Sequence, residues 1–268
     1  MKDLFEQGRA CLLADAPDDK VQLTRAAAQC LRDGQCRLDS HGAAIRISTP
    51  GRPSRPPLVR PAELVQRKLT SPEGRAAFIH ALAHIEFNAI NLAWDAVLRF
   101  RGMPDDYYRD WVSIAAEEAL HFSLLDARLQ ALGSRYGDFP AHDGLWEMAE
   151  KTAADLLVRL ALVPRVLEAR GLDVTPAMIK RLQQAGDSET VAILERIYAD
   201  EIGHVETGSR WFRYVCELRG VEPAATFRQL LLDYNMNRIK PPVNETARMQ
   251  AGFDAKELAM LKEMTGAS

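Results

Sequence analysis

One pattern occurs twice in this chain: a lone glutamate is followed, 32 residues later in the first copy and 33 in the second, by Glu-x-x-His. The six residues concerned are Glu86, Glu118, His121, Glu168, Glu201 and His204. Residues three positions apart lie on one helix face with Cβ atoms about 5–6 Å apart, so each Glu-x-x-His can direct both side chains at one metal ion. One glutamate from each of two helices and a Glu-x-x-His from each of two others make a bundle-core di-metal site. The pattern therefore predicts four helices that together bind two metal ions.

The donor atoms and their charge favour iron or manganese. Four carboxylates and two neutral imidazoles carry four negative charges, which two divalent ions would neutralise. Without metal, buried carboxylates this close together would repel one another and shift towards their protonated forms. Oxygen donors with one imidazole per ion suit iron or manganese better than a thiolate set would. We expect two iron ions as the cofactor, with manganese as the alternative.

The neighbours of these glutamates distinguish a buried site from chance pairs on solvated helix faces. Residues one helical turn from Glu86, Glu118 and Glu201 are mainly apolar, whereas surface glutamates usually have polar neighbours there. Glu168 differs, because Pro164 and Arg165 precede it by one turn. The apolar surroundings of the other three favour the buried site.

Helix start and stop signals predict an all-α fold. Ser71-Pro72-Glu73 combines an N-cap serine, a proline at the first helical position and an acid in the first turn. Four long helices are predicted, from Pro72 to Arg101, from Pro104 to about Gly133, from Asp143 to Gly171 and from Ser188 to Arg219, with a small inserted helix from Thr175-Pro176 to Gln184. Short connections make consecutive helices antiparallel neighbours. The expected architecture is a four-helix bundle built from two similar helix pairs.

The rest of the chain flanks this bundle. We expect N-terminal helices and a Pro-rich arm in residues 1–60, the bundle in 61–222 and a C-terminal helical extension in 223–268. The arm, residues 35–60, is predicted to be extended because of its prolines and glycines. Its arginines allow two interpretations: residues 50–60 contact RNA or an acidic partner, or the arm wraps the bundle and its arginines pair with acidic helix faces.

Composition indicates a soluble protein. The net charge of −3 gives no general attraction to nucleic acid or anionic membranes. The N-terminus lacks the apolar core of a secretory signal, and no apolar run reaches the length of a membrane span. The four cysteines contain no Cys-x-x-Cys, which indicates a reducing cytoplasm rather than a disulfide scaffold or a zinc finger. Nucleotide-binding and nucleophile-elbow motifs are also missing from the sequence.

Two further residues lie close in sequence to the predicted ligands. Tyr198 precedes Glu201 by one helical turn on the same face. We expect it to act in catalysis through a hydrogen bond near the metals, although an ordinary core tyrosine fits equally well. His84 precedes Glu86 by two residues, which turns it about 200° around the helix. We expect it to be hydrogen-bonded rather than to bind metal.

The repeated motif resembles that of the ferritin-like superfamily of carboxylate-bridged di-iron proteins. The stretch from about Pro50 to Phe253 more closely resembles the ferritin-like family known as DUF455. The residues that carry this likeness are Gly51-Arg-Pro-Ser-Arg-Pro-Pro-Leu-Val59, His80-Ala-Leu-Ala-His-Ile-Glu86 and Lys240-Pro-Pro-Val-Asn-Glu245. MiaE-type di-iron hydroxylases that modify tRNA are a more distant likeness, through the metal motif alone. The resemblance implies a ferritin-like bundle with a di-iron centre and leaves the substrate open.

Four functions fit these observations. The first is an oxidase or hydroxylase that uses O₂ and a separate electron donor on an unknown small molecule. The second is an iron-binding, ferroxidase-like protein. A storage shell needs a compact subunit, so the additions at both ends of the bundle and at 172–186 argue against this function. The third is a tRNA-modifying hydroxylase, and the fourth is a scaffold without redox activity. The complete set of six ligands favours the first.

Overall fold

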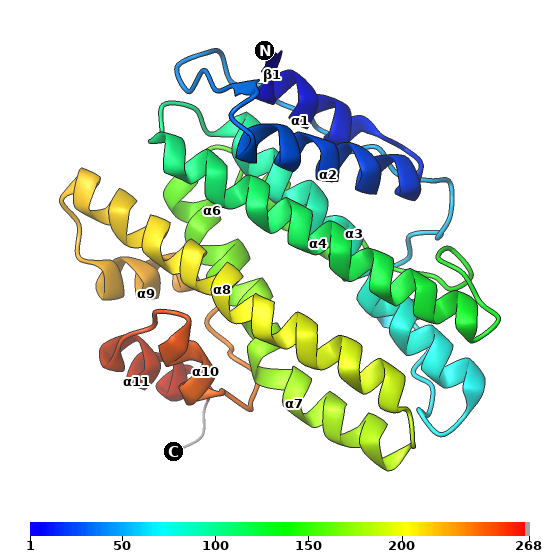
Figure 1. Cartoon of the computed structure of the whole chain (residues 1–268). Coiled ribbons are helices and arrows are strands. Elements are labelled where there is room, and N and C mark those ends of the chain that lie inside the picture. The colour runs from blue at the N-terminus through cyan, green and yellow to red at the C-terminus, as the bar shows by residue number, and fades with distance from the viewer. Residues whose placement is uncertain (266–268) are drawn as a thin grey trace. The chain divides into compact units, whose positions relative to one another are not determined.

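The computed structural model describes residues 1–265, and most of them are helical (Figure 1). The strands in that range are β1 (Lys2–Asp3) and β2 (Cys36–Arg37), which pair in parallel with Lys2 opposite Cys36. The predicted all-α class is confirmed. No helix among these residues combines the length and the apolar character needed to cross a membrane. The chain divides into two compact units after Glu150, called unit 1 and unit 2 below.

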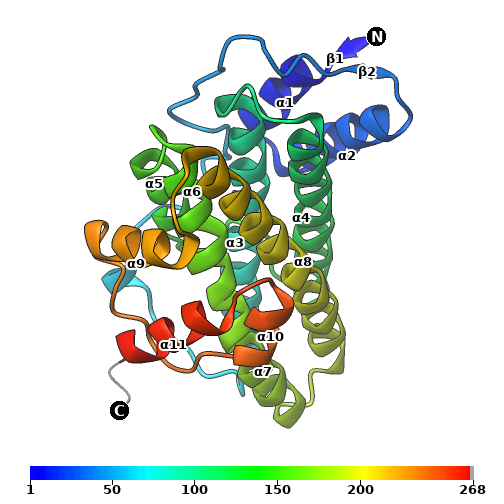
Figure 2. The ribbon, with the colours of Figure 1, turned by 90° about the vertical axis from the view of Figure 1, so that its left-hand side faces the viewer.

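Unit 1 is built on a pair of long helices. The helices α3 (Pro72–Arg99) and α4 (Asp105–Ala131) pack along each other, as Figure 2 shows. The N-terminal helices cover them, α1 (Leu4–Leu13) against α3 and α2 (Pro17–Arg32) against α4. The unit also contains a 3₁₀ turn, η1 (Pro61–Glu63), and ends in α5 (Gly144–Lys151). Because α1 and α4 both pack on α3, most of the residues of α3 are buried and it lacks a wide polar face.

The start of α3 follows from its local sequence, but its end does not. The Ser71 hydroxyl accepts a hydrogen bond from the Gly74 N–H at 3.0 Å, as predicted for an N-cap. The helix ends at Arg99, two residues before the predicted end. The Ile45 N–H donates to the Leu98 carbonyl at 2.9 Å, and the Gly102 N–H donates to the Ser40 carbonyl at 2.8 Å. These bonds from a distant segment satisfy the end of α3 and direct the chain away.

The extended arm belongs to unit 1. The Gly51 N–H donates to the Leu12 carbonyl at the end of α1, and the Val59 N–H donates to the Ala141 carbonyl, each at 2.8 Å. An isolated bridge pairs Leu58 with Ala141 in the same place. The arm is therefore bound to the folded unit by its backbone, which agrees with the interpretation in which it wraps the helices.

Unit 2 contains one long distorted helix and one long regular helix. The distorted helix consists of α6 (Leu156–Leu162), a π-helical turn η2 (Val163–Glu168) and α7 (Ala169–Gln184), and it packs against α8 (Ser188–Arg219). Three shorter helices follow: α9 (Pro223–Asp233), α10 (Glu245–Gln250) and α11 (Ala255–Met264). Of these, α10 packs on α7 and α8, whereas α9 packs on α6 and α8.

The predicted third helix and the inserted helix after it are wrong. Residues 152–155 interrupt the predicted helix, and Asp155 caps α6 by accepting from the Leu157 N–H at 2.7 Å. Pro176 does not start a helix; it lies inside α7. A proline there leaves the carbonyl four residues earlier, that of Leu172, without its helical donor. The Asn244 side chain donates to that carbonyl at 3.1 Å, which explains why the helix continues.

Pro164 has a different effect at the start of η2. It likewise removes one backbone donor, and here the helix widens into a π turn that runs to Glu168. Gly208 on α8 faces the Pro164 ring, which would overlap any Cβ at that position. The absence of a side chain at residue 208 therefore allows α8 to approach the turn that carries Glu168.

Replacing Gly208 should destabilise unit 2. We expect Gly208→Ala to lower the free energy of unfolding by about 1–3 kcal/mol, because a proline ring cannot move aside as a flexible side chain can. Thermal or urea unfolding followed by circular dichroism measures the change. Gly171→Ala is the matched control, since nothing lies within 4 Å of a Cβ there. A Gly208→Ala protein as stable as that control would contradict the close packing.

A buried histidine makes the stability of unit 1 sensitive to acid. The His80 side chain is 0% exposed, and its Nε2 accepts a hydrogen bond from the Gly137 N–H at 2.9 Å. Burial lowers the pKa of His80 to about 4. Between this value and the ordinary pKa of about 6.5, the unfolded chain binds a proton that the folded chain does not. Stability therefore falls as the pH drops through this window.

We expect the His80 contribution to be on the order of 2–3 kcal/mol between pH 7 and pH 4. His80→Gln keeps an acceptor for Gly137 but cannot titrate, so its free energy of unfolding should change less over this window than that of the wild type. His41, which is exposed, provides the control variant His41→Gln. Equal pH dependence in wild type and His80→Gln would show that His80 does not contribute.

Candidate metal centre

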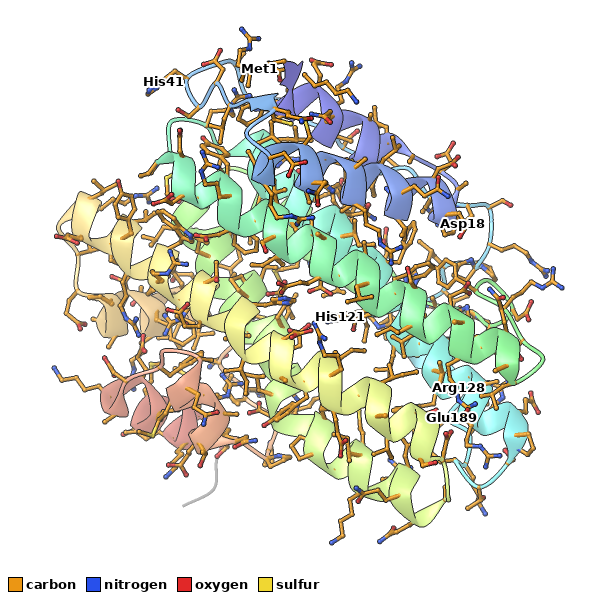
Figure 3. The ribbon with its side chains drawn as sticks, in the orientation of Figure 1. Met1, Asp18, His41, His121, Arg128 and Glu189 are labelled. Carbon is orange, nitrogen blue, oxygen red and sulfur yellow. The ribbon has the colours of Figure 1, made fainter. Side chains whose placement is uncertain are left out.

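Three of the predicted ligands meet in unit 1. Glu86 lies on α3, and Glu118 and His121 lie on α4, where Figure 3 labels His121. The His121 Nδ1 lies 3.2 Å from Glu86 Oε2 and 3.3 Å from Glu118 Oε2. All three side chains are buried, with residue exposures of 5%, 1% and 0% in sequence order. Donor atoms about 3 Å apart can share one ion that lies about 2.1 Å from each.

The electrostatics of this cluster favour a positively charged occupant. Burial alone lowers the pKa of His121, but hydrogen bonds and charge interactions with Glu118 and Glu86 outweigh it and raise the pKa to about 11. Two buried carboxylates thus attract a proton to the imidazole. A divalent ion would satisfy the same charges more fully, so the donor set fits a metal.

Aromatic side chains lie next to two of these ligands in sequence. The rings of Phe87 and Phe122 lie 5.6 Å apart, and the Tyr136 ring lies 5.2 Å from that of Phe122. Both phenylalanines are buried at 2% exposure. The three ligands are themselves 5% exposed or less, so bulk water has little access to them and their electrostatic interactions are stronger than in water.

Unit 2 repeats part of this arrangement on α8. Glu201 Oε1 lies 3.5 Å from His204 Nδ1, one helical turn further along. The histidine is buried, and the side chain of Glu201 is 15% exposed. Glu168, the remaining predicted ligand, is the last residue of η2, which packs against α8. Unit 2 therefore carries the same three residue types on two packed helical segments.

Tyr198 has a partner that the sequence did not indicate. Its hydroxyl accepts a hydrogen bond from the Asn244 side chain at 2.9 Å. Asn244 also caps α10, since its Oδ1 accepts from the Ala247 N–H at 3.2 Å. Tyr198 therefore ties α8 to the segment before α10. No local signal reveals this contact, because the two residues lie 46 positions apart.

His84 is hydrogen-bonded through its ring, as predicted. Its Nδ1 lies 2.8 Å from the Tyr136 hydroxyl, and its Nε2 lies 3.1 Å from the His142 carbonyl. Both ring nitrogens are thus engaged with other groups of unit 1. The π-helical turn before Glu168 was not predicted, although Pro164, four residues upstream, is the signal that could have revealed it.

Comparison with known proteins agrees with the resemblance seen in the sequence. The model of the family described as "Protein of unknown function (DUF455)" matches residues 13–259. An uncharacterised protein of Haemophilus influenzae is 46% identical over 219 residues, which cover 79% of this chain and 76% of that protein. No solved structure matches the chain.

The unit 1 cluster should bind metal through Glu118. We expect Glu118→Ala to weaken metal binding by about 100-fold or more, because it removes a direct ligand. Elemental analysis after anaerobic loading with Fe²⁺ or Mn²⁺, together with the metal-induced rise in the unfolding midpoint, measures this. Glu117→Ala is the matched control, since the neighbouring residue faces another side of α4. Full metal occupancy in Glu118→Ala would mean that this cluster is not the site.

Proposed function

Because the chain belongs to the DUF455 family, whose description states no function, we propose its function from the site: a di-metal carboxylate centre that uses O₂ to oxidise or hydroxylate a small organic molecule. The carrying observation is the buried cluster of Glu86, Glu118 and His121, which attracts positive charge. In this proposal the second copy of the sequence motif, Glu168, Glu201 and His204, completes the six-ligand set.

The number of metal ions follows from charge and donor count. Each half offers two carboxylates and one imidazole, and two negative charges balance one divalent ion. Two such halves match the ligand set of di-iron and di-manganese bundle proteins. We propose iron as the resident metal and manganese as the alternative, because both suit oxygen-rich donor sets with imidazole.

In the proposed reaction the metal centre would supply the redox chemistry, and the protein would supply the ligands and the surroundings. A reduced di-iron centre supplies the electrons with which O₂ is activated, and a separate electron donor would restore them. The glutamates would balance the charge of the metals, and each histidine would supply one nitrogen donor. The burial of Glu86, Glu118 and His121 would keep bulk water from the site. The Tyr198 hydroxyl, held by Asn244, is the group that we propose for hydrogen bonding to the reacting molecule.

The cellular setting that we propose is the cytoplasm. The cysteines of the chain, Cys11, Cys30, Cys36 and Cys216, are all free thiols. Free thiols are usual where glutathione and thioredoxin keep proteins reduced. A reducing compartment would also supply the electrons that the proposed reaction needs.

The proposed oxygen chemistry is tested by rapid mixing. We expect the anaerobic ferrous protein to develop a transient absorbance when mixed with oxygenated buffer in a stopped-flow instrument. His121→Ala and His204→Ala should both abolish this transient, because each removes the imidazole from one half of the centre. Glu117→Ala should keep it.

Three other results would change the conclusion. Ferrous protein that stays unoxidised in air for hours would exclude oxygen activation and leave a non-redox metal role. Rapid oxidation with accumulation of many ferric ions per chain would indicate a ferroxidase instead. Loss of the transient in His121→Ala alone would show that the second copy of the motif takes no part in this chemistry.

A further inference from the structure

A basic cavity lies in unit 2, apart from the proposed metal ligands. Its volume is about 400 Å³, within the range of about 300–1,000 Å³ that is usual for small-molecule sites. Of the described residues that line it, five carry positive charge and one, Asp173, carries negative charge. The cationic residues are Arg165, Arg170, Arg238, Lys240 and Arg248. The lining therefore has a large excess of positive charge.

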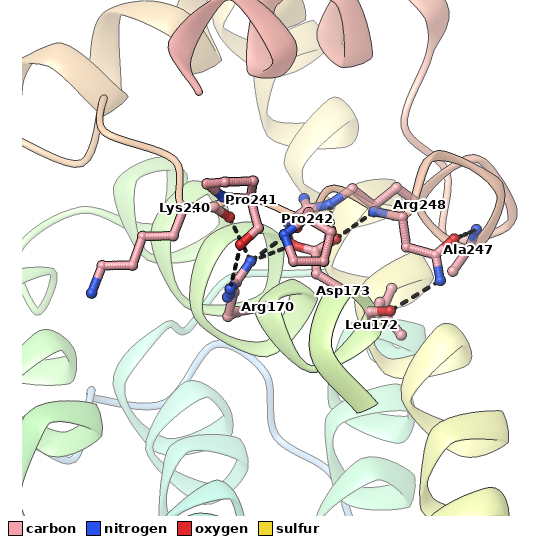
Figure 4. Close-up of polar contacts among 9 residues, drawn as sticks. Arg170, Leu172, Asp173, Lys240, Pro241, Pro242, Ala247 and Arg248 are labelled. Atoms are coloured by element: carbon pink, nitrogen blue, oxygen red, sulfur yellow. Dashed lines mark hydrogen bonds and ion pairs between the residues drawn. The ribbon is translucent and has the colours of Figure 1, made fainter. Parts of the chain in front are cut away.

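Asp173 does not offset this excess, because its oxygens are already engaged (Figure 4). Arg248 binds both of them, with Nε 2.9 Å from Oδ1 and Nη2 2.8 Å from Oδ2. The Asn244 N–H donates to Oδ1 at 2.9 Å. Arg170 Nη1 also lies 3.5 Å from Oδ2. The carboxylate is 0% exposed, and its single negative charge cannot balance the five positive charges of the lining.

Two buried guanidinium groups retain donors without partners. Arg248 is 3% exposed, and its Nη1 has no hydrogen-bond partner in the described part of the chain. Arg165 is 0% exposed; its Nη2 lies 2.5 Å from Glu257 Oε1, its guanidinium packs on the rings of three phenylalanines, and its Nε and Nη1 have no hydrogen-bond partner among residues 1–265. Burying an unsatisfied charged donor destabilises a protein. These nitrogens have almost no accessible surface, so an anion in the cavity that both arginines line would stabilise their charge through space and not by accepting from them.

Two further cations, Arg238 and Lys240, lie on a segment beside the cavity that Arg170 holds in place. Arg170 donates from Nη1 to the Lys240 carbonyl at 2.6 Å and to the Pro242 carbonyl at 3.0 Å (Figure 4). These bonds fix the segment that carries Arg238 and Lys240, whose side chains are exposed. The cavity thus has buried cations inside and exposed cations on the adjoining segment.

We propose that this cavity binds a phosphorylated small molecule by its phosphate group. The Nε and Nη2 atoms of Arg248 are occupied by Asp173, so this arginine has no free fork of two donors for a carboxylate. A phosphate accepts single hydrogen bonds from several directions and carries up to two negative charges, which matches the separate, exposed donors of Arg238 and Lys240. Apolar side chains from Val166, Met236 and Leu261 also line the cavity and would contact the organic part.

Calorimetric titration of the full-length, chelator-treated protein with inorganic phosphate tests this proposal, because metal removal separates the cavity from phosphate bound to a metal. Adenosine monophosphate and adenosine, compared at constant ionic strength, test whether the phosphate is required. We expect phosphate and the monophosphate to bind and adenosine not to bind. The double variant Arg238→Gln/Lys240→Gln should weaken phosphate binding about tenfold or more, because two charge-assisted contacts are lost.

The double variant Lys180→Gln/Arg181→Gln is the matched control, because it removes the same charge from exposed positions on α7 outside the cavity lining. Its affinity for phosphate should stay within about twofold of the wild type if charge at a distance contributes little. Equal weakening by the two double variants would reduce the effect to general attraction and overturn the proposal. Binding only in the metal-loaded protein, equal binding of adenosine, or no phosphate binding at millimolar concentration would also overturn it. None of these outcomes depends on the proposed oxygen chemistry.

Discussion

The two carboxylates of Glu86 and Glu118 are buried on neighbouring helices, and this charge is what the rest of unit 1 has to accommodate. Burial of an ionised carboxylate is costly unless it is paired. His121 lies within 3.3 Å of both, and one imidazolium carries a single positive charge beside two negative ones. A divalent ion would balance both carboxylates, which is the electrostatic argument for the proposed metal. The packing of α3 along α4 brings the two carboxylates together despite their repulsion.

Proline shows why unit 2 could be predicted only in part. Pro164 and Pro176 lie in the same helical run, and each removes one backbone donor. Asn244 supplies a donor to the carbonyl affected by Pro176, so a regular helix continues, whereas the helix at Pro164 widens into a π turn. The sequence rules for proline describe the loss of a donor. They do not describe a replacement donor that lies 72 residues further along the chain.

The parts that were predicted correctly depend on local contacts. Ser71, predicted as the N-cap of α3, acts within one helical turn of itself. The bounds predicted for α8, Ser188 to Arg219, are also correct, and its caps Asp187 and Gly220 are equally local. The spacing within Glu-x-x-His is equally local, and both pairs were found with carboxylate and imidazole on one face. The interruption at residues 152–155, the Tyr198–Asn244 contact and the basic cavity were not predicted. Each depends on a tertiary contact or on packing between segments that are distant in sequence.

The basic cavity and Glu168, a proposed metal ligand, share one structural element. Val166 and Leu167 line the cavity, and Glu168 is the next residue of the same π turn. A phosphorylated ligand in the cavity would therefore contact the turn that positions Glu168. If that contact changes the preferred conformation of the turn, it changes the metal affinity of unit 2. Linkage then requires that metal binding change the affinity for the ligand by the same factor. The π turn, which Gly208 allows to pack closely on α8, is the element through which the two sites would influence each other.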